Sequence, residues 1–164
     1  MAVAANWTEQ LTAIATAVGA IGLLGAIVAA VYAGQQVREA RRSRQAQIAA
    51  EFLRRWDEAD LVETRRLVAR FESAEELAAA FQEYIRTNSM EAYVLFRELD
   101  YFEQLGALEH VGALHLQLVQ LLLGKRLVDR WKLWKPSIDA MGGDDVYPMF
   151  ASLAAKVERS PQPA

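Results

Sequence analysis

The chain has 164 residues, 53% of them hydrophobic, no cysteine and a formal net charge of −3. This length allows one domain, or one domain with an appendage, and the lack of cysteine excludes disulfides, thiolate catalysis and cysteine-based zinc sites. The slightly acidic balance argues against a general nucleic-acid-binding protein, which usually carries a strong basic excess.

Residues 11–34 contain no charged side chain. At about 1.5 Å of rise per residue, a helix of this length crosses the roughly 30 Å hydrocarbon core of a bilayer. The ten residues before it include no lysine or arginine, whereas a signal peptide begins with a basic region and has a shorter apolar stretch. We therefore predict a retained transmembrane helix over residues 11–34, preceded by a short extracytoplasmic segment over residues 1–10.

Basic and aromatic residues mark the ends of this predicted span. Trp7 and Tyr32 lie roughly 37 Å apart along a helix, which suits the two membrane interfaces. Four arginines follow the span and none precedes it, so the positive-inside rule places the following domain in the cytoplasm and the N-terminus outside. We read them as topology and headgroup anchors, in preference to a specific lipid switch: Arg38, Arg41, Arg42 and Arg44. The predicted location is the inner (plasma) membrane of a bacterium.

One face of the predicted span consists of small residues, and the opposite side is bulky. Lipid tails already solvate leucine and isoleucine, so helices in a bilayer associate mainly where small residues let their backbones approach. We therefore expect a partner helix, from a second copy of the chain or from another membrane protein. The absence of any specific partner is the alternative, because glycine and alanine are common in membrane helices. The small-residue face comprises Thr12, Ala15, Gly19, Gly22, Ala26, Ala29 and Ala33.

No strand pattern appears after residue 35, and apolar residues recur at intervals of three and four. We expect an all-α fold in which the membrane helix continues into a stalk. The predicted parts are a basic juxtamembrane helix over 35–56, a cytoplasmic helical bundle over 57–159 and a disordered tail over 160–164.

Capping signals in the sequence indicate where two helices of the predicted bundle begin. Asp60 with Glu63, and Ser73 with Glu76, each match the capping box that opens a helix. A longer helix over about 89–108 is apolar around most of its circumference and is therefore expected at the centre of the bundle.

Glycines are expected to end or interrupt helices in the second half of the bundle. Gly106 and Gly112 are predicted to bracket a turn, and Gly124 to break the next helix. The remaining helices are then predicted over 114–123, 126–140 and about 145–159.

Three segments carry a resemblance to a known family. They are FLRRWD at 52–57, LDYFEQLG at 99–106, and 131–138 with its internal Pro136. Together with the basic-flanked N-terminal anchor, and over about residues 10–155, they resemble a bacterial family of helical membrane-anchored proteins catalogued only as a domain of unknown function. The resemblance implies a helical fold with a membrane anchor, and it brings no activity.

Glu98 is the one acid that interrupts an apolar helical row, which includes Val94, Tyr101 and Leu105. A carboxylate in such a row is either paired or shifted in pKa. We expect structural pairing with an arginine of a neighbouring helix, from Arg65, Arg66 or Arg126.

No catalytic motif, metal site or cofactor site is predicted. A di-iron bundle requires Glu-x-x-His motifs, and none occurs. His110 and His115 span a glycine turn, so they are not expected to share a helix face. The basic helix around Trp131 and Trp134 could lie on the inner leaflet, but we favour core positions for both tryptophans.

These features predict a noncatalytic, membrane-tethered interaction or scaffold module that self-associates through its small-residue face. One alternative is a homo-oligomeric pore or membrane-disrupting effector, in which four residues line a narrow passage: Thr8, Thr12, Gly19 and Gly22. A second alternative is a membrane-bound enzyme or ligand sensor that uses Glu98.

Overall fold

A computed structural model describes residues 2–160, with side chains at residues 7, 12, 16, 19, 22, 23 and 25–160. The described residues form six α-helices and no strand, so the all-α prediction is confirmed. The chain divides into two compact units, residues 1–44 and 45–164, and each is considered by itself.

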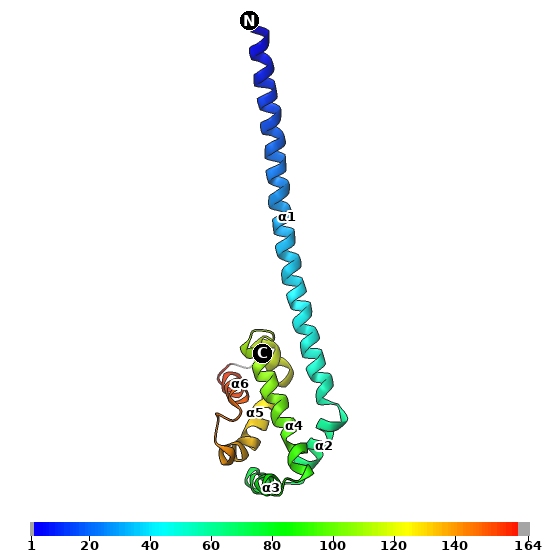
Figure 1. Cartoon of the computed structure of the whole chain (residues 1–164), viewed down its shortest axis with the longest axis vertical. Helices are drawn as coiled ribbons and strands as arrows, with labels where there is room; N and C mark the ends of the chain where they lie inside the picture. Colours follow the sequence, from blue (N-terminus) through cyan, green and yellow to red (C-terminus); the bar gives the residue numbers. More distant parts are fainter. Residues whose placement is uncertain (1, 161–164) are drawn as a thin grey trace. The chain divides into compact units, whose positions relative to one another are not determined.

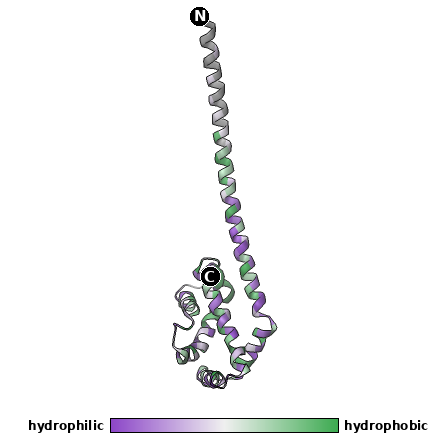
Figure 2. Ribbon diagram, in the orientation of Figure 1, coloured by the Kyte–Doolittle hydropathy of each residue, from purple (hydrophilic) through white to green (hydrophobic). Residues whose placement is uncertain are grey.

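Helix α1 (Ala2–Trp56) contains the described residues of the first unit and the beginning of the second. It has no proline, and no glycine follows Gly34 within it, so nothing in its later half interrupts the helical hydrogen bonding. Figure 2 shows apolar residues of α1 giving way to hydrophilic ones within the same helix. The predicted continuity of helix through residues 35–56 is therefore observed.

Among the residues that the structure describes, no helix combines the length and the hydropathy required of a membrane span. Most side chains between residues 11 and 24 lie outside the described part. The span over residues 11–34 stays a prediction.

The second unit is a helical bundle built around α4 (Met90–His110) (Figure 1). Helix α4 packs against α2 (Ala59–Val68), α3 (Ala74–Arg86), α5 (Leu116–Met141) and α6 (Pro148–Arg159). Its predicted central position is confirmed, because apolar side chains on several of its sides are completely buried: Leu95, Leu99, Tyr101 and Phe102.

Aromatic rings connect the end of α1 to three other helices. Trp56 lies 5.2 Å from the Tyr101 ring and 5.5 Å from the Phe102 ring, measured between centroids. Phe102 stacks on Phe150 of α6 at 4.8 Å, and Trp131 of α5 meets Phe150 edge-on at 5.0 Å. The FLRRWD and LDYFEQLG segments therefore contact each other in the core, which identifies them as packing motifs.

The two predicted capping boxes have different outcomes. Ser73 caps α3, since its hydroxyl accepts a hydrogen bond from Glu76 N at 3.1 Å, as predicted. The prediction for Asp60 is wrong, because helical hydrogen bonding already begins at the Glu58 carbonyl, which accepts from Val62 N. Asp60 thus lies inside the first turn of α2.

The predicted breaks at Gly106 and Gly124 are also wrong, since α4 continues to His110 and α5 passes through Gly124 without interruption. Gly106 serves close packing: a Cβ there would lie 2.3 Å from the Met149 carbonyl oxygen. Only Gly112 lies in the turn, with φ of +71°, a region that favours glycine.

Helix α6 begins at Pro148, later than predicted, and a carboxylate from α4 caps it. Glu103 accepts hydrogen bonds from Met149 N at 3.1 Å and Phe150 N at 2.8 Å. These amides belong to the first turn of α6, where a negative charge is favourable. Glu103 and Gly106, one helical turn apart on α4, therefore set where α6 begins and how closely it approaches.

Candidate functional site

The described apolar side chains of α1 within the first unit are exposed. Leu23 is 65% exposed and Tyr32 63% exposed, and Ile27, Val28 and Val31 are also more than half exposed. Trp7, the other predicted interfacial aromatic, is exposed as well. Large apolar side chains exposed in succession along one helix indicate a surface that is covered by lipid or by another protein.

The small-residue face occupies part of this exposed helix. Thr12, Gly19, Gly22, Ala26, Ala29 and Ala33 are exposed, whereas the side chain of Ala15 lies outside the described residues. A Cβ added at Gly19 or Gly22 would meet no atom within 4 Å. This face therefore has room for another helix to approach its backbone closely.

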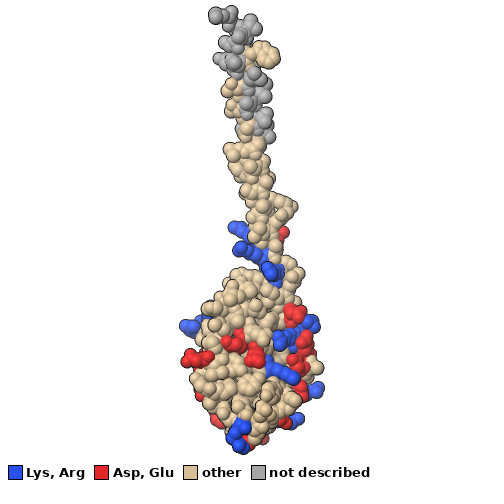
Figure 3. Space-filling view, viewed as in Figure 1, with Lys and Arg blue, Asp and Glu red and all other residues tan. Residues whose placement is uncertain are grey.

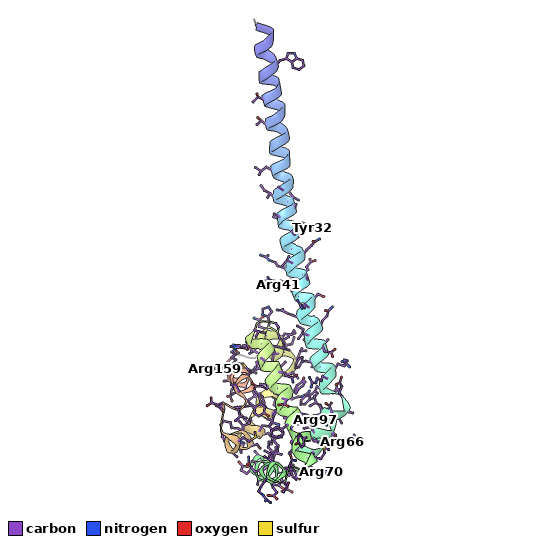
Figure 4. The ribbon with its side chains drawn as sticks, in the orientation of Figure 1. Tyr32, Arg41, Arg66, Arg70, Arg97 and Arg159 are labelled. Carbon is purple, nitrogen blue, oxygen red and sulfur yellow. The ribbon has the colours of Figure 1, made fainter. Side chains whose placement is uncertain are left out.

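The four predicted anchor arginines follow on α1. Figure 3 shows basic side chains gathered on α1 beside a stretch without charged side chains. Figure 4 shows Tyr32 and Arg41 pointing away from the helix axis. Each arginine is exposed, and within the described part of the chain no carboxylate forms an ion pair with any of them: Arg38, Arg41, Arg42 and Arg44.

Glu98 is completely buried inside the bundle, between α4 and α5. Its Oε1 lies 3.0 Å from Nε of Arg130, and it accepts a hydrogen bond from the Trp134 indole at 3.2 Å. The Arg130 side chain is only 19% exposed. The ion-pair partner therefore differs from the three arginines named from the sequence, because α5 lies against α4 with Arg130 and Trp134, four residues apart, facing Glu98.

Burial raises the pKa of Glu98 above its ordinary value of 4.5, although Arg130, Trp134 and Arg65 act in the opposite direction. Its Oε2 atom is buried and has no hydrogen-bond partner among the described residues. A single carboxyl held by an arginine and an indole resembles a structural ion pair more than a catalytic pair.

Replacing Glu98 with glutamine should remove one component of the pH dependence of stability. Because the folded-state pKa is raised, the folded protein binds this proton more tightly than the unfolded chain does. The stabilisation from the protonated carboxyl is complete below pH 4.5 and is lost as the pH rises through the folded pKa. Urea titrations at several pH values should therefore show the wild type losing stability relative to Glu98→Gln with rising pH. Parallel curves would contradict the raised pKa.

The other polar candidates lie apart from Glu98. Glu109 forms an ion pair with Lys156 of α6 at 2.6 Å. His110 is the last residue of α4 and His115 precedes α5, and both are exposed. Within the described residues, no group of three or more histidine or acidic side chains is arranged to hold a metal ion. Trp134 is completely buried and Trp131 is partly buried against the core, which agrees with core positions for both.

A large open cavity runs along α5, and it was not predicted from the sequence. Its volume is about 1070 Å³, and residues 120–126 and 128–130 of α5 form most of its lining, together with Leu133 and the end of α6. The signal that could have indicated it is the adjacent pair Leu121 and Leu122, which precedes the cations Lys125 and Arg126 on the same helix. The sequence predicted a helix break at Gly124, between the two leucines and the two cations. With that break the four residues would not lie on one helix, so no shared surface was expected from them.

Comparison with known proteins gives one match. Residues 17–157 match the family described as DUF4760, a domain of unknown function. No curated protein matches the chain. No solved structure matches it either.

Proposed function

The chain belongs to the DUF4760 family, and we propose that it acts as a membrane-anchored helical interaction module that self-associates through the small-residue face of α1. The family description assigns no activity, so the proposal rests on the residues of this chain. In this proposal residues 11–34 span the inner membrane of a bacterium, and the bundle lies on the cytoplasmic side.

One observation carries the proposal: a charge-free helical segment with exposed apolar side chains is followed directly by four exposed arginines. Exposing so many apolar side chains to water is unfavourable, at roughly 25 cal/mol for each Å². A bilayer removes this cost, and arginines next to the apolar segment then interact with anionic headgroups, each worth about 1 kcal/mol near the surface.

Self-association is supported by the uncovered small-residue face. A helix partner could approach Gly19 and Gly22 without displacing any side chain of the described residues, since no atom lies within 4 Å of a Cβ built at either position. Close backbone approach increases van der Waals contact, which is the main source of attraction between helices in lipid. The bundle would then be presented in two or more copies to a cytoplasmic partner.

The double substitution Gly22→Ile with Ala26→Ile should shift the full chain toward the monomer. Both changes place a branched side chain on the small-residue face and keep the segment apolar, so they block backbone approach without preventing insertion. The readout is the oligomeric mass of the full chain in lipid nanodiscs, measured by native mass spectrometry.

Val28→Ile with Val31→Ile is the matched control, because it adds bulk to residues that are already bulky. It should leave the mass unchanged. A monomeric wild type, or an oligomer that survives Gly22→Ile with Ala26→Ile, would refute the association face. Release of the wild type from membranes by alkaline carbonate would refute the anchor. Steady ion currents across planar bilayers containing the oligomer would instead favour the pore.

A further inference from the structure

The cavity along α5 combines an apolar part and a cationic part in two adjacent helical rows. Leu122, Arg126, Arg130 and Leu133 recur at intervals of four, four and three, and Leu121 and Lys125 lie in the neighbouring row. Leu121 is 69% exposed, although it is a large apolar side chain. Ligand cavities have typical volumes of roughly 300–1,000 Å³ and combine an apolar lining with a few polar groups. The cavity of about 1070 Å³ fits that description.

Its charges leave a positive surplus. The lining has three cations, Lys125, Arg126 and Arg130, and two acids, Asp129 and Glu158. Glu158 is engaged by Lys132, a residue outside the lining, at 2.9 Å. Lys125 and Arg126 form no ion pair with any carboxylate of the described residues. Arg130 is paired with Glu98, so the charge available to an anion comes mainly from Lys125 and Arg126, and Asp129 opposes it among the described lining residues. The Arg126 guanidinium also lies over the Trp56 ring, 5.8 Å from the ring centroid.

The buried carboxylate of Glu98 forms an ion pair with one of these cations, Arg130. Its Oε1 contacts Nε of Arg130, and the two Nη atoms of Arg130 donate no hydrogen bond to any described residue. The Nε atom of Arg130 lies 3.0 Å from the Glu98 carboxylate, so the terminal N–H groups of the guanidinium are left for a planar anion. Glu98 is thus a positioning residue for Arg130.

We propose that this cavity binds an anionic amphiphile, a single acyl chain that carries one carboxylate or phosphate group. The anionic group contacts Arg130, Arg126 and Lys125, and the acyl chain covers Leu121 and Leu122. This site is independent of the small-residue face of α1 and goes beyond the function proposed above. A membrane location would supply such ligands, but the chemistry of the site does not require one.

The test is photocrosslinking of the full chain in phosphatidylcholine nanodiscs. Two probes carry the same diazirine-labelled acyl chain, and they differ only in the headgroup: lysophosphatidic acid and lysophosphatidylcholine. Peptide mapping should find the anionic probe on residues 116–141, at about ten times the level of the zwitterionic probe, and unlabelled lysophosphatidic acid should compete. Labelling of residues 11–34 reports separately on the membrane span, so the two proposals can fail independently.

Lys125→Gln with Arg126→Gln should reduce labelling of α5 about tenfold, and Leu121→Asn should also reduce it. These side chains are exposed, so the bundle should keep its circular dichroism. The melting temperature should change little, since the one contact with the core that is lost is that of Arg126 with the Trp56 ring, at 5.8 Å. Arg70→Gln with Arg86→Gln removes the same charge from exposed positions outside the cavity and should leave labelling unchanged.

Three results would overturn the proposal. Equal labelling of α5 by both probes would remove the role of the anionic group. Full competition by inorganic phosphate alone would identify a site for soluble anions, in which the acyl chain has no part. A change in oligomeric mass caused by Lys125→Gln with Arg126→Gln, at unchanged labelling, would show that a second copy of the chain covers this surface.

Discussion

Gly106→Ala is expected to destabilise the helical bundle by about 3 kcal/mol, although alanine is normally the better helix former. A Cβ at this position would lie 2.3 Å from the carbonyl oxygen and 2.5 Å from the carbonyl carbon of Met149. These are backbone atoms at the start of α6, and Glu103 holds the same turn in place through two hydrogen bonds. The clash can therefore be relieved only by moving α6 away from α4. Thermal unfolding should show a melting temperature lower by roughly 10 °C.

Gly124→Ala is the matched control, because Gly124 also lies inside a helix of the bundle. The nearest side-chain atom to a Cβ there would be Val157 Cγ1 at 3.8 Å, which is ordinary van der Waals contact. With no clash to oppose it, the gain in helix propensity should stabilise the protein by about 0.5–1 kcal/mol. If both substitutions changed stability in the same direction, the close approach of α6 to Gly106 would be wrong.

Arg130→Met is expected to cost about 3 kcal/mol at pH values above the raised pKa of Glu98, because it leaves the completely buried carboxylate without its counter-charge. The loss should become smaller under acidic conditions, since protonation of Glu98 removes the uncompensated charge. Chemical denaturation at neutral and at acidic pH measures both effects. The unfolding transition should stay cooperative, because methionine can retain much of the packing of the arginine stem.

Two further variants separate this effect from a general loss of packing. The double variant Arg130→Met with Glu98→Gln contains no buried charge and should recover much of the lost stability. Lys132→Met breaks the exposed ion pair with Glu158 and should change stability little. An Arg130→Met protein as stable as the wild type would show that Glu98 needs no counter-charge at this position.

The buried ion pair and the α5 cavity share Arg130, so stability and ligand binding are linked at this residue. A ligand anion that contacts Arg130 would compete with Glu98 for part of its charge. Melting temperatures with and without lysophosphatidic acid should therefore report binding in the wild type, since a ligand that binds only the folded state raises its stability.

The helical class, the central position of α4 and the Ser73 cap were all predictable from the sequence. Apolar periodicity and capping depend on residues at most four positions apart, so they can be read from the chain directly. The charge-free segment over residues 11–34 and the arginines after it are also visible from neighbouring residues in the chain. They are the basis of the proposed membrane anchor.

The roles of the glycines and the ion-pair partner of Glu98 depend on contacts between helices and could not be predicted from the sequence. Gly106 and Gly124 have the same local signal, yet neither ends its helix, because packing against α6 stabilises helix through both positions. The choice of Arg130 over Arg65, Arg66 or Arg126 depends on how α5 lies against α4. The α5 cavity depends likewise on where α6 ends beside that helix. Such contacts join residues distant in the chain, and helical periodicity specifies which side of each helix is buried without specifying which neighbour it meets.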